Sequence, residues 1–188
     1  GAVAFARPSV SAASIMNAVT ARAVSDDGVA PGGVISLYGS NLTTGNTAQA
    51  DGAWPAELAG SWVTVNQKPA SLLFASPGQI NAQLPADLEA GSPATLKVVS
   101  PAGASQGVEV RVEPATPGLL AIAGDGAKPG EIVSLFATGL GAATPAVPAG
   151  MPAPRDPLSY TVEAPSVSVA DAAAGVTFAG LAPDWVGL

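Results

Sequence analysis

The chain has 188 residues, with Lys+Arg 7, Asp+Glu 14, a formal net charge of -7 and neither His nor Cys. The acidic balance excludes a basic surface for nucleic-acid phosphates and argues against binding to an anionic membrane surface. Without His and Cys, the chain has no Ser-His-Asp or Cys-His catalytic group and no disulfide framework. No apolar run approaches the ~18 residues of a membrane span, so membrane insertion is not expected.

Turn-forming residues divide the apolar residues into short runs. The chain contains Gly 22 and Pro 18, and 48% of its residues are hydrophobic although only 5% are aromatic. Short apolar runs between glycines and prolines predict strands and turns, and therefore an all-β protein. Its cores must consist mainly of Val, Leu, Ile and Ala.

The first residues predict an extended arm. Within Gly1–Ala13, Val3 and Phe5 alternate with small alanines, and Pro8 interrupts the pattern, as in an edge strand. Ser14–Val24 has some helical spacing of its apolar residues, although β-branched residues and the lack of a clear stop weaken this interpretation.

A series of short strands follows. Val34–Tyr38 is the first, and the polar, aperiodic stretch Thr43–Glu57 predicts a long loop after it. Several short strands separated by turns are typical of an immunoglobulin-like β-sandwich. The further predicted strands are Trp62–Asn66, Ser71–Ala75, Ile80–Leu84, Ala94–Ser100 and Gly107–Val112.

The segment around the first strand occurs twice. Ala30–Leu42 returns 98 positions later as Lys128–Leu140. A second similarity, with small insertions, links Leu73–Ile80 with Thr177–Val186. A repeat of this length indicates that one small domain was duplicated.

The second copy is predicted to be incomplete. The first copy continues beyond Ile80 through further strands, whereas the second ends at Leu188 soon after its matching position. We therefore expect an N-terminal arm (1–13), a first immunoglobulin-like domain (14–114) and a second one (115–188) that lacks its final strands. The strands expected in the second domain are Leu119–Ile122, Ile132–Phe136, Ser166–Val169 and Val176–Phe178.

Four stretches of the chain resemble one protein family. They are Pro31–Leu42, Ser76–Pro85, Thr138–Pro148 and Phe178–Leu188. They resemble bacterial C-terminal modules first noted in Solibacter-type acidobacteria, which consist of tandem immunoglobulin-like (IPT/TIG-like) folds. The resemblance implies a place at the end of a large secreted or surface protein and no catalytic residues. The family usually continues after the final Gly-Leu with one more strand, which this chain does not contain.

Carboxylates are the remaining candidates for catalysis. Glycosidase chemistry needs two of them in one cleft, with a separation of about 5–10 Å. The pairs that lie close in sequence are expected in a turn or at solvated strand ends, so we expect no catalytic activity. These pairs are Asp26/Asp27, Asp87/Glu89 and Glu109/Glu113.

Calcium is the metal that such a sequence could hold. Asp26, Asp27, Asp125 and Glu131 precede the two matching strands, and oxygen-rich loops between β-domains can bind this ion. However, Asp beside Gly is also ordinary turn chemistry. We expect no cofactor and leave structural calcium as the less favoured alternative.

Three tryptophans could form a platform for stacking sugars. Trp62 begins a predicted strand beside valines, and Trp185 follows Pro183, so both are expected in or at the end of a core. Trp54 lies in the predicted loop and is the one ring expected to be exposed. Polysaccharide binding is therefore an alternative function.

The predicted function is assembly by strand donation. An incomplete sandwich leaves apolar side chains and unpaired backbone groups exposed, and such edges recruit strands from other chains. The donor residues are predicted to be Val3, Phe5 and Val10. The acceptor groove of the neighbouring copy is predicted to contain Val176, Phe178, Trp185 and Val186.

The contact would join unlike surfaces, and its repetition would give a head-to-tail filament. We expect a non-catalytic structural module on the bacterial cell surface, secreted and without cofactor. Three alternatives remain: the chain is cut short, its own N-terminus folds back, or the protein is a carbohydrate- or surface-binding accessory module.

Overall fold

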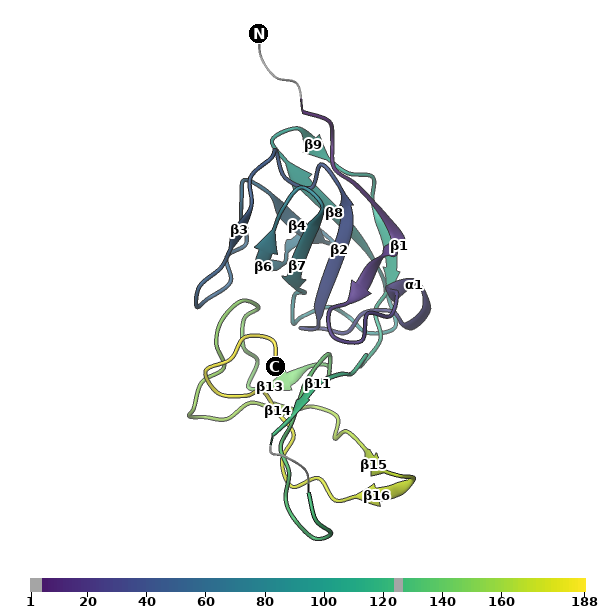
Figure 1. Ribbon diagram of the computed structural model, residues 1–188, viewed down its shortest axis with the longest axis vertical. Coiled ribbons are helices and arrows are strands. Elements are labelled where there is room, and N and C mark those ends of the chain that lie inside the picture. The colour runs from purple at the N-terminus through teal and green to yellow at the C-terminus, as the bar shows by residue number, and fades with distance from the viewer. Residues whose placement is uncertain (1–4, 124–126) are drawn as a thin grey trace.

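The computed structural model describes residues 5–123 and 127–188 and shows an all-β protein (Figure 1). Most of its strands belong to two five-stranded sheets in the first part of the chain. We call residues 5–113 the first half and the described residues from 114 to 188 the second half. No helix of the described ranges is long and apolar enough to cross a membrane.

One sheet of the first half contains the repeated segment. Its strands lie in the antiparallel order β1-β2-β7-β6-β3. They are β1 (Ser9–Asn17), β2 (Val34–Ser40), β7 (Gln79–Gln83), β6 (Ser71–Ala75) and β3 (Ala48–Gln49).

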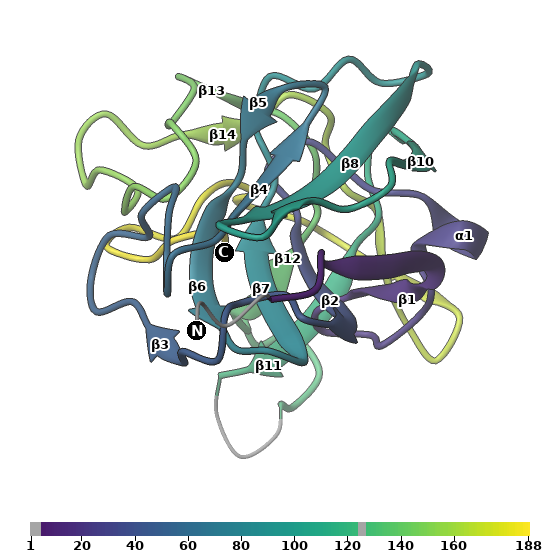
Figure 2. The ribbon, with the colours of Figure 1, turned by 90° about the horizontal axis from the view of Figure 1, so that it is seen from above.

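The second sheet of the first half has the order β10-β8-β4-β5, with β9 paired to β8. The two sheets lie face to face (Figure 2), and their inner side chains form one buried core. The strands are β10 (Val108–Arg111), β8 (Pro93–Ser100), β4 (Trp62–Val65), β5 (Lys68–Pro69) and β9 (Gly103–Ala104).

The core of the first half consists of Val, Leu, Ile and Ala, as the composition predicts. In β2, Ile35 and Leu37 face the core, and in β8 the residues Ala94, Leu96 and Val98 do so. Since side chains alternate along a strand, the residues between them face outward. Each fully buried Leu or Val contributes roughly 1.5–3 kcal/mol to folding.

The hairpin of β6 and β7 agrees with the sequence. Its turn is closed by a hydrogen bond from Ser76 N to Gln79 O of 2.8 Å. Ile80, Ala82 and Leu84 are fully buried on the inner face, and β7 lies where the sequence predicts the strand Ile80–Leu84. Gln83 lies on the outer face, where it contacts the second half.

The N-terminal stretch differs from the prediction. The helical spacing of Ser14–Val24 is misleading, because β1 occupies residues up to Asn17 and the helix α1 is only one turn long (Val24–Asp27). Ile15 pairs with Leu37 across the sheet and is fully buried. Burial of this β-branched residue in a sheet outweighs the weak helical pattern.

The second half consists of three two-stranded sheets. They pair β11 (Gly118–Ile122) with β12 (Leu135–Thr138), β13 (Ala143–Thr144) with β14 (Tyr160–Thr161), and β15 (Val167–Val169) with β16 (Ala172–Ala174). The strand predicted at residues 176–178 is wrong, because that segment has no strand structure. None of the described residues of this half belongs to the main core.

Candidate functional site

The junction between the halves is built around Gln83. This side chain is buried on the outer face of β7 and has both of its polar atoms bonded. Its Nε2 donates to Gly32 O at 3.2 Å, and its Oε1 accepts from Gly150 N at 2.7 Å. A buried amide satisfied on both sides holds its partners in one geometry, so Gln83 fixes a loop of the second half onto β7.

Gly150 is the residue of the second half at the centre of this junction. Its N–H donates to Gln83, and its carbonyl accepts from Trp54 N at 2.8 Å. Its φ is +82°, and an added Cβ would collide with the Trp54 carbonyl and lie 2.5 Å from Ser71 Oγ. Only glycine combines this backbone conformation with so close an approach.

Two further hydrogen bonds connect the halves. Val34 N, at the start of β2, donates to Thr138 Oγ1 at 3.2 Å, so the start of β2 lies beside the end of β12. Asn17 Nδ2 donates to Thr116 O at 3.0 Å. These bonds hold the β11–β12 ribbon at the end of the first half where β2 begins (Figure 1).

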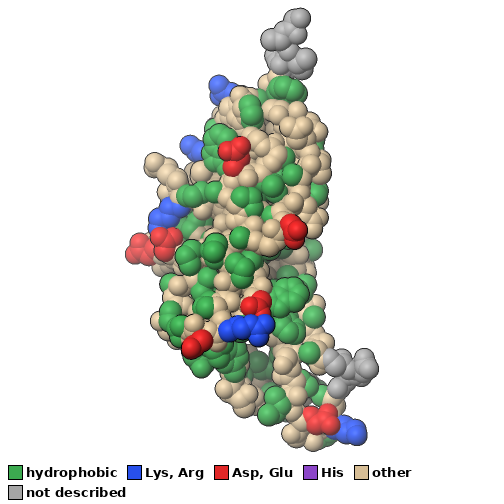
Figure 3. Space-filling view, turned by 90° about the vertical axis from the view of Figure 1, so that its left-hand side faces the viewer, with side chains coloured by type: hydrophobic (Ala, Val, Ile, Leu, Met, Phe, Trp, Pro, Cys, Tyr) green, Lys and Arg blue, Asp and Glu red, His purple; other side chains and the backbone are tan. Residues whose placement is uncertain are grey.

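The second half exposes many large apolar side chains. On the face shown in Figure 3, hydrophobic side chains gather over the middle and lower parts of the molecule, around a small group of charged side chains. Monomeric proteins rarely leave large contiguous apolar patches in water, so such surfaces indicate contact sites. The exposed apolar residues of this half include Leu119, Leu120, Ile122, Ile132, Val133, Leu135, Val162, Val169, Val176, Phe178 and Trp185.

Matching positions of the internal repeat differ in burial between the two halves. In the first half, Ile15 and Leu37 form a cross-strand pair, and both are 0% exposed. Leu135 is the sequence counterpart of Leu37, and it pairs with Ile122 across the β11–β12 ribbon. Ile122 is 55% exposed and Leu135 is 40% exposed. The second half therefore has the same apolar pair without the layer that covers it.

The backbone of β12 also pairs with another strand on one side only. In the first half, β2 lies between β1 and β7 and pairs with both. In the second half, β12 corresponds to β2 and β11 takes the position of β1. Within residues 5–123 and 127–188, no strand occupies the position of β7 beside β12. This free edge is the second element of the candidate site.

The residues predicted as one acceptor groove lie in two places. Phe178 packs edge-on against Tyr160 with ring centroids 5.3 Å apart, and Val176 is exposed in the segment before it. Trp185 and Val186 instead line an open groove against the first half. Because β16 ends at Ala174 and no strand joins these residues, the four side chains do not form a single groove.

The predicted donor residues are also placed differently. Val3 lies outside the described residues, and Phe5 is 52% exposed. Val10 belongs to β1, where it pairs with Gly39 and packs against the core of its own half. The segment free to donate a strand therefore ends before Ser9, and the independent arm is shorter than residues 1–13.

Two of the three tryptophans line the groove between the halves. Trp54 and Trp185 lie along an opening of about 480 Å³, together with Asn81, Leu73, Leu120 and Asp184. Trp185 is 59% exposed, so the expectation that it closes a core is wrong. Trp62 is half-buried in β4. The sequence alone does not indicate that Trp54 and Trp185 meet, because 131 positions separate them and the second half brings them together.

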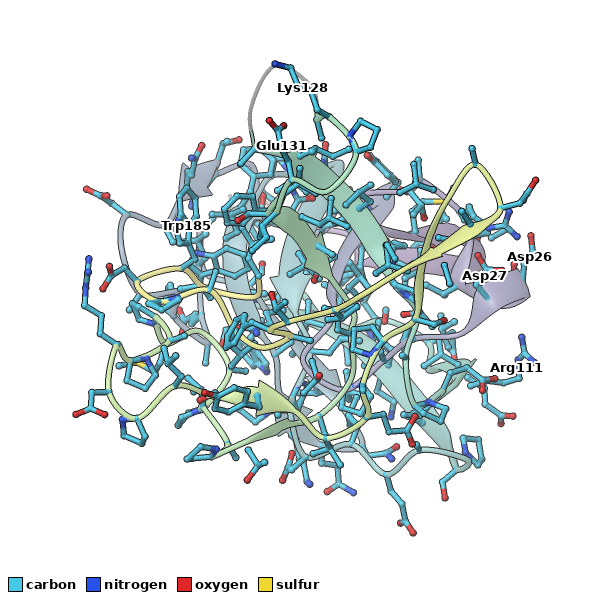
Figure 4. All side chains as sticks on the ribbon, turned by 90° about the horizontal axis from the view of Figure 1, so that it is seen from below. Asp26, Asp27, Arg111, Lys128, Glu131 and Trp185 are labelled. Carbon is cyan, nitrogen blue, oxygen red and sulfur yellow. The ribbon has the colours of Figure 1, made fainter. Side chains whose placement is uncertain are left out.

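The acidic residues do not form a metal site in the described ranges. Asp26 and Asp27 lie far from Glu131 (Figure 4), so the residues proposed for calcium are not gathered, and Asp125 lies outside the described residues. Arg22 binds Asp27 in an ion pair, and this hydrogen bond lowers the pKa of the Asp27 carboxyl.

The other candidate carboxylates are engaged in surface pairs. The Lys68 ammonium donates to Asp87 at 2.6 Å, and this hydrogen bond lowers the pKa of the Asp87 carboxyl. Glu113 Oε1 lies 3.6 Å from Arg111 Nη1. These carboxylates are solvated or paired with cations, and they do not face one another across a cleft of the described chain.

No protein-family model matches the sequence, and no curated protein is significantly similar to it. The resemblance to the bacterial C-terminal modules therefore stays a prediction. The function has to be inferred from the geometry of the exposed ribbon and the groove beside it.

Proposed function

We propose that the chain is a non-catalytic extracellular structural module of two tandem immunoglobulin-like units, in which copies assemble head to tail. Each copy would complete the second half of the next one by adding a strand. The observation that carries this proposal is the exposed Ile122–Leu135 pair, because the matching Ile15–Leu37 pair is fully buried in the first half.

Exposed apolar surface gives the driving force. Burying an apolar surface is worth about 25 cal/mol per Å², and a Leu or Ile side chain gains roughly 1.5–3 kcal/mol when it becomes fully buried. Several such side chains lie together on the β11–β12 ribbon and the residues beside it. Association that covers them can therefore offset the entropy lost when two copies join.

The edge of β12 has few of the features that prevent strand addition. Natural edge strands are protected by charged residues, prolines or bulges that face the solvent. The segment from residue 132 to residue 138 contains no charged residue and no proline. It belongs to the half that lies beyond the start of β2, whereas the N-terminal end of β1 lies at the opposite end of the first half (Figure 1), which suits a head-to-tail contact.

The state of association tests the proposal. We expect the intact chain to form multimers whose size grows with concentration in sedimentation and light-scattering measurements. Replacing Ile122 and Leu135 by Lys should shift it toward monomers, since both side chains are exposed and their loss should not unfold the first half. Thr95→Lys with Gln106→Lys adds the same charge to exposed positions of the first half and should leave assembly unchanged. An intact chain that stays monomeric up to its solubility limit would overturn the proposal.

Carbohydrate binding is a second candidate, favoured by the common groove of Trp54 and Trp185. Trp185 is exposed, whereas Trp54 is half-buried and not exposed as the sequence predicted, and both indoles lie beside the polar residues Asn81 and Asp184. Under this function, the chain would bind insoluble polysaccharide as a monomer, and Trp185→Ala would abolish the binding. Val169→Ala is the matched control, because it truncates an exposed apolar side chain away from the groove and should leave the binding unchanged.

A further inference from the structure

We infer that the acceptor site is the free edge of β12, and that it binds residues 1–6 of a second copy in the position that β7 holds in the first half. This inference rests on the proposed head-to-tail assembly and names the two segments that would make the contact. The internal repeat and the side chains of β7, which fills the matching position in the first half, support this contact.

The first half shows what the β12 edge lacks. There, β7 pairs antiparallel with β2 over five residues, from Val34 opposite Gln83 to Tyr38 opposite Gln79. The counterparts of Val34, Ile35 and Ser36 are residues 132–134, which form no strand. β12 begins only at Leu135. Residues 132–134 are three of the five positions that a strand in the place of β7 would pair with, so an added strand should extend β12 backward.

The side chains beside that edge are also more exposed to solvent than their counterparts in the first half. Ile35 is 3% exposed in the first half, whereas its counterpart Val133 is 39% exposed. The occupant must therefore offer apolar side chains on alternate positions, as β7 does with Ile80, Ala82 and the following Leu84.

Residues 1–6 have this pattern. Val3 and Phe5 are two positions apart and alternate with Ala2, Ala4 and Ala6, and the segment contains no charged side chain. Pro8 has no backbone N–H, so pairing should stop before it. Phe5 is exposed in its own copy, so its ring remains available to another copy.

The position of this segment favours a contact between copies. Ser9, the first residue of β1, pairs with Ser40 at the end of β2, whereas Val34 at the start of β2 bonds to Thr138 of the second half. The chain before Ser9 thus leaves the first half at the end away from β12 (Figure 1). A second copy stacked on that end would bring its β12 edge to the segment. Repetition of this contact joins unlike surfaces and gives a filament.

Two double variants distinguish the proposed strand pairing from nonspecific hydrophobic association. Val3→Asp with Phe5→Asp puts carboxylates on the face predicted to be buried, and association should weaken by about tenfold or more because a buried charge is costly. Ala4→Asp with Ala6→Asp adds the same charge to the opposite face and should retain most of the association. Equal loss in both variants would overturn the inference. Association that persists in the Val3→Asp/Phe5→Asp protein would also overturn it, while leaving the proposed assembly intact.

A peptide experiment locates the acceptor. A synthetic peptide of residues 1–8 is added to the full chain carrying Val3→Asp and Phe5→Asp, and amide hydrogen exchange is measured. We expect slower exchange at residues 132–138, which the added strand would pair with, and no change at the exposed edge strand β3. Protection elsewhere, or none, would overturn the inference. Protection of residues 132–138 in the same variant before any peptide is added would also overturn it, because the edge would then be covered by the chain itself.

Discussion

The two halves contain the same apolar pattern in different structural settings. In the first half, Ile15 and Leu37 lie between two five-stranded sheets, and the core around them is closed. In the second half, Ile122 and Leu135 pair in the same way on a two-stranded ribbon. The comparison shows that an apolar strand pattern specifies which face should be buried but does not supply the layer that buries it.

The halves also differ in what holds them in place. The first half is held by its core, in which more than twenty buried apolar residues are in contact. The second half has two buried apolar side chains among its described residues, Ala153 and Val186, and depends on polar contacts at Gln83, Gly150 and Thr138. We therefore expect the second half to open locally at a lower free energy than the first.

The largest expected effect comes from truncating the matched leucines. Leu37→Ala removes a fully buried side chain and should lower the free energy of unfolding by about 2–5 kcal/mol. Leu135→Ala removes its exposed counterpart, and in the monomeric chain it should cost less than about 0.5 kcal/mol. Urea denaturation of dilute protein measures both. Leu84→Ala, at the fully buried residue that follows β7, should fall in the range of Leu37→Ala. A similar cost at Leu37 and Leu135 would mean that the halves do not differ as described.

Much of the first half could be predicted from sequence because its strands carry local signals. The alternation in β10 and the turn at Pro77 and Gly78 follow from nearby residues alone. The strand β1 was obscured by a weak helical spacing that only the pairing of Ile15 with Leu37 overrides. At the N-terminus, the sequence therefore indicates that a regular element is present more clearly than it indicates whether that element is a strand or a helix.

The candidate site was less predictable, because its contacts join distant parts of the chain. The strand that carries Gln83 is predictable from the sequence, but the hydrogen bond from Gly150 N to Gln83 Oε1 depends on how the second half docks. The same docking brings Trp185 to Trp54 and separates it from Phe178. The repeat predicted the kind of surface that the second half exposes, and only the packing of the two halves shows where it lies.

An intermediate effect is expected at the junction. Gly150→Ala adds a Cβ that would collide with the Trp54 carbonyl and with Ser71, at a residue whose φ is +82°. Gly130→Ala is the matched control, because Gly130 has a φ of +88° but no atom within 4 Å of the added Cβ. Backbone strain of this kind costs about 1–3 kcal/mol at either position, and the collision adds to it only at Gly150.

The readout for this pair is the attachment of the second half. Gly150→Ala should speed amide exchange at residues 54 and 150 and increase proteolytic cleavage near residues 113–118, while the first half remains folded. Gly130→Ala should leave these signals unchanged. If both variants behave alike, the close approach at Gly150 does not hold the halves together.

The smallest expected effect is a pH dependence confined to the first half. The hydrogen bond from Arg22 lowers the pKa of Asp27 in the folded protein. Because the pKa of Asp27 is lower in the folded than in the unfolded protein, the ionised carboxylate stabilises the fold. This contribution to the free energy of unfolding is fully present above the unfolded pKa of about 3.9. It is lost as the pH falls through the folded pKa. The pair is largely exposed, so the contribution is small.

Asp27→Asn should therefore reduce the slope of stability against pH below about pH 4, measured by urea denaturation at a series of pH values. Asp26→Asn removes the neighbouring carboxylate, which forms no ion pair within the described residues, and should keep the slope. An identical slope for the wild-type and Asp27→Asn proteins would show that the Arg22 pair does not stabilise the fold. The buried core of the first half would then account for its stability without a contribution from the Arg22–Asp27 ion pair.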